Sequence, residues 1–572
     1  MAASKELDVE NKGLDVENKE MDVENQAPAT EASPGTVLPA YDGTALGQTN
    51  TLRRSLQGRH MQMIAIGGAI GAGLFVGTGG ALHSGGPGAL LICYLIVGGM
   101  LLVTIQALGE LAVLYPENGA FFTYCVRFIS PACDWKYNRG FSVGWDYALS
   151  WLTVLPFELT AASITIKYWN DTLNVGIFIT IFLVALCVVQ IFGVRGYGEV
   201  EFVLSVIKVT ALIGFIILGI VIDCGGAPNG GYIGAHYWHD PGAFTTFEGF
   251  CSVFVTCAFA FAGTELSGLA AAEAANPAKT IPKATKQVFW RIMIFYVLGT
   301  FIVGLIVPSS ADYLLGSSGA NTKASPFVVS IQQAGIKGLP SVMNAVITIA
   351  VLSVANSATY GSSRTIQALA EHKMAPKFLA YIDKHGRPLY CILLQIAFAF
   401  LAFINEAKQG ETIFTWLLAL SGISNFFVWG SICLAHIRFR QAWKYHGRDI
   451  KELAFVAPFG VIGSCIGFGL VVLCLIAAFY TAVAPLSAMT FFENYLAAPI
   501  VLALMAGWGI YGKFNKDPEL KRGVWFTRIQ DMDVLSNIRD TALDSDLAPR
   551  KEYATWGEWF KAAPMRILRS LI

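Results

Sequence analysis

Four ionisable side chains lie inside stretches of this chain that are otherwise apolar: Glu110, Glu158, Lys208 and Glu265. Such a charged group costs about 2.5–3.5 kcal/mol to insert into a membrane, so each is a functional candidate by default. The chemistry open to them is the uptake and release of a proton, or the binding of a charged ligand. Glu158, in PFELTAAS, is a candidate for a ligand's ammonium group or for a proton path, with a structural hydrogen bond to a neighbouring helix as the alternative.

The other three groups carry different expectations. A lysine in surroundings of low dielectric can load and release a proton, although Lys208 is close enough to the membrane surface for its ammonium to snorkel there instead. Glu265 follows a glycine, and we expect it to couple protonation to a rearrangement of its helix. Glu110 lies near the end of its apolar stretch, and we expect a structural role in which it pairs with the segment 115–139. We expect that segment to be an amphipathic loop and helix at the membrane surface rather than a full span.

Glycine is unusually frequent in residues 66–82, IGGAIGAGLFVGTGGAL, where it takes seven of seventeen positions. Each glycine inside a helix costs about 1 kcal/mol relative to alanine. One explanation is close helix packing, through the small-xxx-small spacings of Gly67 with Gly71 and of Gly73 with Gly77. The other is a helix broken at Gly71-Ala72-Gly73, near the middle of the membrane, whose free N–H groups bind an anion such as a carboxylate.

A second stretch favours the broken-helix explanation. Residues 250–274 read FCSVFVTCAFAFAGTELSGLAAAEA, with Gly263-Thr264-Glu265 in the middle. Unwound backbone is tolerated deep in a membrane only where it is buried or lines a cavity. The two stretches are the first helices of two five-span halves, and interrupted helices at corresponding positions of two repeats indicate a transporter's binding site.

The elements that must position these residues are membrane-spanning helices. Of the 572 residues, 54% are hydrophobic and only 14% are charged. Apolar runs of about 20 residues, the length that crosses a hydrocarbon core, recur along the chain. We therefore expect an all-α membrane protein with twelve spans. Their limits are 60–82, 87–113, 141–166, 174–194, 200–222, 246–271, 287–308, 339–362, 389–405, 411–435, 457–482 and 488–512.

Polar tails flank the spans. We expect a disordered N-terminal tail at 1–57, which holds the seven-residue repeat LDVENKG, LDVENKE, MDVENQA, a transporter domain at 58–512 and a C-terminal tail at 513–572. Basic residues gather in alternate loops, with Arg291 and Arg364 among them, which predicts that both termini are cytoplasmic. The eleven cysteines form no metal-binding or disulfide pattern, so neither a metal nor a cofactor is expected.

Several motifs resemble one known family. They are GGAIGAGLFVGTG in span 1, SGGPGALLICYLIVGGMLLVTIQALGELAVLYP in span 2, FAFAGTELSGLAAAEAANP in span 6 and SSRTIQALAEHKMAPK after span 8. The chain resembles the fungal, yeast-type amino-acid permeases of the amino acid–polyamine–organocation superfamily from Leu56 to the end of span 12, and on into Trp556-Gly557-Glu558-Trp559-Phe560. The resemblance implies five-plus-five inverted repeats with two extra helices. It also implies proton-coupled uptake of L-amino acids across the plasma membrane.

The resemblance also implies a site. The substrate carboxylate would bind the backbone amides of Gly71, Ala72 and Gly73. The ammonium would meet the backbone carbonyls of Phe259, Ala260 and Ala262, with the Phe259 ring as an aromatic gate. The ammonium of Lys208 would stand in for a sodium ion near span 1. Ser421, with Ser150 as a weaker candidate, would tune substrate choice, and Lys5, Lys12 and Lys19 would accept ubiquitin.

Other functions stay open at this point. We expect a broad substrate range, as in general amino-acid permeases, because the visible lining is mostly small and uncharged. A specialist for cationic or proline-like amino acids is the alternative, as is an amino-acid sensor on a transporter scaffold. A polyamine transporter would not need a carboxylate site in span 1. An enzyme is disfavoured, because the chain shows no nucleophile–base pair, and no GxxxxGK[ST] motif points to direct use of ATP.

Overall fold

The computed structural model describes residues 56–129, 139–170, 172–274, 276–311, 314, 325–406, 410–484, 486–514 and 527–538. Lys5, Lys12 and Lys19, nearly all of the predicted N-terminal tail and most of the predicted C-terminal tail lie outside these ranges. Within them the chain is helical, and its one extended contact is an isolated parallel bridge between Leu56 and Ala274.

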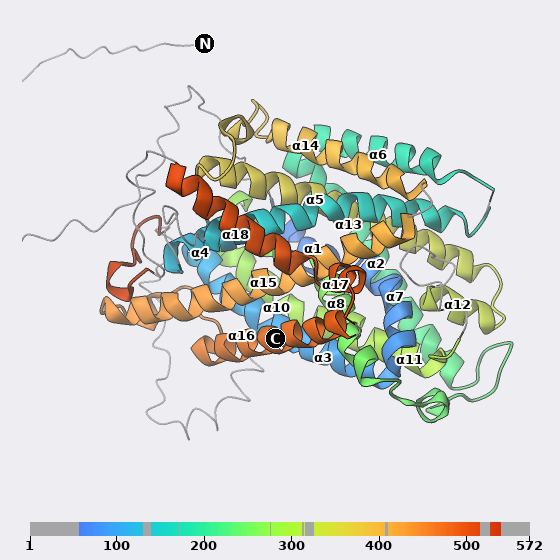
Figure 1. Cartoon of the computed structure of the whole chain (residues 1–572). Helices are drawn as coiled ribbons and strands as arrows, with labels where there is room; N and C mark the ends of the chain where they lie inside the picture. Colours follow the sequence, from blue (N-terminus) through green and yellow to red (C-terminus); the bar gives the residue numbers. More distant parts are fainter. Residues whose placement is uncertain are drawn as a thin grey trace, which may run out of the picture. The chain divides into compact units, whose positions relative to one another are not determined.

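The helices follow one another along the chain as shown in Figure 1. The α-helices are α1 (Gly58–Gly67), α2 (Ala72–Phe75), α3 (Gly77–Leu114), α4 (Phe121–Phe128), α5 (Arg139–Ile166), α6 (Val175–Ile191), α7 (Gly193–Asp223), α8 (Phe247–Phe261), α9 (Leu266–Leu269), α10 (Pro277–Arg291), α11 (Gly299–Ile306), α12 (Pro326–Gln333), α13 (Leu339–Glu371), α14 (Leu389–Ala399), α15 (Gly410–Tyr445), α16 (Gly460–Val483), α17 (Ala488–Tyr495) and α18 (Ala497–Phe514). The short 3-10 and π helices are η2 (Trp238–Gly242), η3 (Ala270–Glu273), η4 (Ile292–Leu298), η7 (Lys377–Ala380), η8 (Phe400–Glu406), η9 (Ile450–Glu452) and η11 (Ile529–Asp531).

Eight helices in the described part of the chain are long and apolar enough to cross a membrane, and three shorter apolar helices accompany them. Together they fall in every predicted span except the first. The first predicted span contains α1, α2 and the beginning of α3, none of which crosses a membrane alone. The total of twelve spans therefore stays a prediction, while the all-helical membrane class agrees with the structure.

The join between the first two predicted spans differs from the expected loop. Helix α3 runs continuously from Gly77 to Leu114 except at Gly86, where φ is 84° and the helix kinks. Gly86 precedes Pro87, which has no backbone N–H and disfavours helical backbone in the residue before it. A side chain at Gly86 would also lie 2.7 Å from the carbonyl oxygen of Ala243. The kink therefore marks where the first predicted span ends and the second begins.

The helices bury many polar side chains within an apolar core and leave apolar side chains exposed on the outside. Ile177, Ile181, Val184 and Val188 are exposed at every third or fourth position of α6. An exposed apolar stripe with this spacing is what a helix presents to lipid. Inside, α5 lies against α13 and α15, and α3 lies against α8, so α5 and α8 bring their residues to the interior (Figure 1).

The segment 115–139 was expected to be an amphipathic helix at the membrane surface. Its described part does form a short helix, α4, but nearly all of its side chains are buried against α5 and α15 rather than lying at a surface. Part of the predicted C-terminal tail covers it. The Tyr115 hydroxyl donates to the carbonyl of Val534 at 2.7 Å, and the Thr527 amide donates to the carbonyl of Ile129 at 3.1 Å.

Candidate functional site

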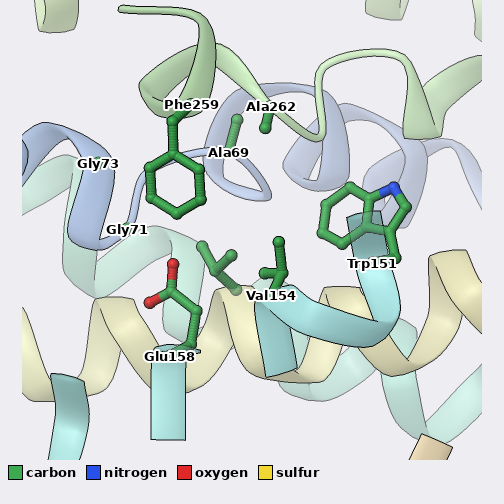
Figure 2. Close-up of a pocket in the computed structure, with 9 residues that line it drawn as sticks. Ala69, Gly71, Gly73, Trp151, Val154, Glu158, Phe259 and Ala262 are labelled. Carbon is green, nitrogen blue, oxygen red and sulfur yellow. The ribbon is translucent and has the colours of Figure 1, made fainter. Parts of the chain in front are cut away.

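A small cavity lies where two interrupted helices meet α5 and α13. Figure 2 shows the Glu158 carboxyl and the Phe259 ring on one side of it and the Trp151 indole on the other. The central cavity is lined by Ala69, Gly71, Gly73, Trp151, Val154, Glu158, Phe259, Ala262 and Val354. Five of the residues that the sequence assigned to a substrate site are among them: Gly71, Gly73, Glu158, Phe259 and Ala262.

The first interruption lies between α1 and α2. The helix α1 ends at Gly67, and helical hydrogen bonds resume when the Phe75 amide donates to Gly71 and the Val76 amide donates to Ala72. The amides that begin α2 have no earlier carbonyl within the helix to bond. Gly73 must be small, because a Cβ there would lie 2.6 Å from the Cα of Ala260. The two interrupted helices thus touch through backbone at this point.

The second interruption lies between α8 and α9. Ala262 has extended backbone, with ψ of 142°, and Gly263 has φ of 92°, a value that favours glycine. The backbone carbonyls of Phe259, Ala260 and Ala262, which the sequence assigned to the substrate ammonium, differ in the hydrogen bonds that they already accept. That of Phe259 accepts from the Ala262 amide at 3.1 Å, and that of Ala260 accepts from the Tyr296 hydroxyl at 3.0 Å. Apart from hydrogen bonds inside helices, no backbone amide of the described residues donates to the carbonyl of Ala262.

Glu265 holds the second interruption in place. Its fully buried carboxyl accepts hydrogen bonds from the Tyr147 hydroxyl at 3.1 Å, the Trp429 indole at 3.3 Å and its neighbour, the Gly263 amide, at 3.1 Å. Three donors from α5, α15 and the break itself therefore converge on one group. The same break is contacted from α10, where the Arg291 guanidinium donates to the Thr264 hydroxyl.

Glu158 reaches the cavity from α5. Its carboxyl accepts a hydrogen bond from the backbone amide of Ala72, and its Oε1 lies 3.5 Å from the place that a Cβ on Gly71 would take. The sequence offered Glu158 as a partner for a ligand's ammonium or as part of a proton path. The structure places it beside the amides expected to hold a carboxylate, and both roles stay predictions.

The Phe259 ring forms one wall of the cavity and packs edge-on against Phe157 of α5, with ring centroids 4.9 Å apart. Ser150 and Ser421, proposed separately from the sequence, lie together. The Ser150 hydroxyl donates to the Ser421 hydroxyl at 3.1 Å, between α5 and α15. Neither serine lines the central cavity, although Ser150 precedes Trp151, which does.

Lys208 lies in a buried cluster. Its ammonium donates to the Ser353 hydroxyl at 2.7 Å and pairs with the Glu201 carboxyl at 3.3 Å. The Ser353 hydroxyl in turn donates to Glu201 at 2.7 Å. Since 0% of the Lys208 side chain is exposed, snorkelling to the surface is ruled out in this structure. Ser353 precedes Val354, a residue of the cavity wall, so α13 links the cluster to the cavity.

Glu110 was expected to pair with the segment 115–139, and that expectation is wrong. Its carboxyl pairs with the Arg440 guanidinium at 2.6 Å, lies 3.2 Å from the His436 ring nitrogen and accepts from the Ala457 amide at 2.6 Å. The group therefore joins α3 to α15 and to the chain that leads into α16. Its role is structural, as expected, with different partners.

Sequence reasoning missed several buried groups. Arg291 and Arg364 were assigned to cytoplasmic loops, but both are buried, and Arg364 pairs with Glu273 at 3.1 Å. Glu201 was not counted among the ionisable residues of the spans. A signal was present, because Glu201 and Lys208 are seven residues apart and two turns of helix bring such residues onto one face. No spacing pointed to Tyr296 or Trp151.

Comparisons with known proteins bear on what this site serves. The amino acid permease family model matches residues 60–521. The chain is 55% identical over 471 residues to the general amino-acid permease GAP2 of Candida albicans, a match covering 81% of this chain and 79% of that protein. It is 50% identical over 517 residues to cationic amino acid transporter 1 of Schizosaccharomyces pombe, covering 88% and 84%. It is 48% identical over 525 residues to the general amino-acid permease GAP1 of Saccharomyces cerevisiae, covering 89% and 85%. With its apolar helices, the chain is a multi-pass membrane protein that belongs to the amino acid permease family.

Proposed function

We propose that this protein carries L-amino acids into the cell across the plasma membrane, together with protons, and that it accepts a broad range of them. The observation that carries the proposal is the central cavity, which is lined by Gly71 and Gly73 at the first interruption and by Ala262 at the second. We propose that it offers a ligand the freed backbone amides of the first interruption and the freed backbone carbonyl of the second. These are the complements of a carboxylate and an ammonium group, the two features common to all α-amino acids. The side chain of the substrate would then lie toward the remaining walls.

The residues have separate tasks in this proposal. The amides of Gly71, Ala72 and Gly73 bind the carboxylate. The carbonyl of Ala262 accepts from the ammonium. The carbonyls of Phe259 and Ala260 can also accept from it, because each carbonyl oxygen can accept two hydrogen bonds and each of these already accepts one. The Phe259 ring closes over the bound substrate.

Proton coupling follows from the place of Glu158. Its carboxyl accepts from the Ala72 amide, which the substrate carboxylate also needs. Two carboxylates about 4 Å apart repel by about 4 kcal/mol at an effective dielectric constant of 20. Substrate binding therefore favours a protonated or displaced Glu158. A proton that crosses about 100 mV supplies about 2.3 kcal/mol, enough to concentrate a neutral amino acid about fiftyfold.

Lys208 and Glu265 serve the coupling in different ways. We assign a proton relay to the Lys208–Glu201–Ser353 cluster, because a proton that passes from the Lys208 ammonium to the Glu201 carboxylate leaves both groups neutral and so leaves no buried charge unpaired. Glu265 ties α5 and α15 to the second break, so a change in its hydrogen bonds would move that break.

Broad specificity is supported by the walls of the cavity, where Glu158 is the one charged residue among those that line it. The alternative is a specialist for cationic amino acids, since relatives named for general and for cationic transport match at similar identity. The Ser150–Ser421 pair would influence substrate selectivity indirectly, through Trp151, which follows Ser150 and lines the cavity. An amino-acid sensor on the same scaffold is the other alternative.

We propose that both tails are cytoplasmic. Lys5, Lys12 and Lys19 of the N-terminal tail would then be accessible to ubiquitin ligases.

Uptake of a radiolabelled amino acid by cells that lack their own permeases tests the proposal. Unlabelled competitors of each side-chain class, mildly acid and neutral medium, and a protonophore are the variables. We expect many competitors to inhibit, uptake to be faster in acid, and the protonophore to abolish accumulation. Inhibition by cationic competitors alone would establish the specialist, and no uptake despite surface expression would favour the sensor.

A further inference from the structure

One hydroxyl group lies between the two interrupted helices. Tyr296, in η4, is fully buried, and its hydroxyl oxygen is 3.1 Å from the carbonyl oxygen of Ala69 and 3.0 Å from that of Ala260. Ala69 lies in the first interruption and lines the central cavity. Ala260 lies two residues before Ala262, at the end of α8. One side chain therefore contacts both backbone segments that enclose the site.

Both carbonyls are available because the helices are broken. In a continuous helix Ala260 would accept from the amide of Thr264, but that amide donates to the carbonyl of Phe261. Ala69 lies between α1 and α2, where the helical ladder is absent. A hydroxyl has one proton to donate, so the two carbonyls share it. Moving the two segments apart would leave a buried carbonyl without a donor, which is costly.

Packing fixes the position of this hydroxyl. The Tyr296 ring stacks on Phe261 with centroids 4.3 Å apart and planes 27° apart, and the Arg291 guanidinium lies 5.7 Å from its centroid. Tyr94 lies on another side, 6.1 Å from the ring. The aromatic neighbours thus hold the ring in place. The hydroxyl therefore has a fixed position between the two interruptions.

We propose that Tyr296 is a positioning residue that sets the separation between the amide side and the carbonyl side of the central cavity. The inference rests on the proposed function. It adds that the site selects its substrates by backbone length, meaning the number of carbons between the carboxylate and the ammonium. An α-amino acid has one carbon between its carboxylate and its ammonium, and a β-amino acid has two. A fixed separation accepts the first and disfavours the second, whatever the side chain.

The test compares uptake of L-alanine and β-alanine by the wild type and by Tyr296→Phe, with the surface amount of each protein measured. We expect the ratio of kcat/KM for L-alanine over β-alanine to fall about tenfold in the variant, mainly through KM, as loss of one buried hydrogen bond would give. The relative uptake of alanine, leucine and lysine should not change, since the side-chain walls are untouched.

Tyr94→Phe is the matched control, because Tyr94 is an adjacent buried tyrosine whose hydroxyl lies 3.4 Å from that of Thr78. An unchanged ratio in Tyr296→Phe, or an equal fall in Tyr94→Phe, would overturn the inference while leaving amino-acid transport standing. If Tyr296→Phe does not reach the surface, Phe261→Leu removes the stacking partner and should lower the same ratio, and an unchanged ratio there rejects the inference. A wild type that carries no amino acid would instead reject the proposed function.

Discussion

The carboxyl group of Glu158 lies on the same side of the central cavity as Gly71 and Gly73 (Figure 2), and it accepts a hydrogen bond from the backbone amide of Ala72, at the start of α2. This contact satisfies one of the amides that α2 leaves without a helical partner. It also puts a carboxyl group of the protein where the substrate's own carboxylate is proposed to bind. Substrate and proton would therefore be linked by competition for one position.

Replacing Glu158 by glutamine tests this link. Glutamine keeps an acceptor oxygen for the Ala72 amide but carries neither a negative charge nor an exchangeable acidic proton. We expect Glu158→Gln to retain exchange of labelled for unlabelled amino acid while its uphill accumulation falls at least tenfold and loses its dependence on pH. Glu199→Gln, a partly exposed glutamate paired with Arg59, is the control and should behave like the wild type. Retained, pH-dependent accumulation in Glu158→Gln would assign the proton elsewhere.

The contact between the two interrupted helices gives a second prediction. A methyl group added in Gly73→Ala would lie 2.6 Å from the Cα and 2.8 Å from the amide nitrogen of Ala260, and backbone atoms cannot rotate away. Overpacking of this kind costs about 1–3 kcal/mol. We expect uptake to fall more than tenfold at equal surface expression.

Gly99→Ala is the matched control for that variant. Gly99 lies within a long apolar helix, α3, and nothing lies within 4 Å of the added Cβ. Its uptake should equal that of the wild type. Equal loss in both variants, or full activity in Gly73→Ala, would mean that the close approach at Ala260 is not needed.

The buried pair of Lys208 and Glu201 gives a third prediction, measured by a double-mutant cycle. Removing one member of a buried pair leaves an uncompensated charge and costs about 3–5 kcal/mol. We expect Lys208→Met and Glu201→Gln each to lose surface expression, and the double variant to regain it because no charge remains. If the cluster exchanges the proton, the recovered double variant will exchange amino acids without accumulating them. Full accumulation by the double variant would show a purely structural role.

Much of this arrangement follows from local sequence. A glycine cluster predicted the first interruption, and Gly263 followed by the carboxylate of Glu265 predicted the second. Glycine tolerates the backbone that Gly263 adopts, at φ of 92°. Glu158 and Lys208 were recognisable because a charge is rare inside an apolar helix. The partners of these groups were not, since Glu201 with Ser353 and Glu265 with Trp429 are joined only when helices far apart in the chain pack together.

Positions at helix ends were the main source of error. Arg291 precedes one apolar run and Arg364 follows another, so both look like loop cations, yet tertiary packing encloses both and gives each a polar partner. Tyr296 has no sequence signal at all, because one tyrosine among apolar residues is indistinguishable from a core residue. Its place between two broken helices is a property of the packed structure alone.

The loop after α13 gives a prediction about pH. Burial by itself would raise the pKa of Asp383, but hydrogen bonds from the amide and guanidinium of Arg387 and from the His385 amide outweigh it and hold that pKa below its ordinary value. Because the pKa is lower in the folded state, the stability gained is fully present above the unfolded value of about 3.9 and is lost as the pH falls through the folded value. This group is therefore unable to produce a pH dependence of uptake between mildly acid and neutral pH.

We expect Asp383→Asn to reduce the free energy of unfolding by about 1.5 kcal/mol at neutral pH, because it loses a charged hydrogen-bond acceptor at Arg387, 2.6 Å away. Thermal unfolding of the purified protein in detergent measures this. The ratio of uptake at mildly acid to neutral pH should match the wild type. A changed ratio would mean that this loop takes part in proton coupling.

The most direct test of proton-coupled amino-acid transport uses the purified protein in liposomes with an imposed proton gradient, acid outside, and radiolabelled leucine. We predict that leucine accumulates inside above its external concentration, that a protonophore collapses the accumulation, and that a dye inside the liposomes reports acidification when leucine is added. Equilibration of leucine without accumulation or acidification would contradict the account, because transport through the cavity would then not be coupled to protons.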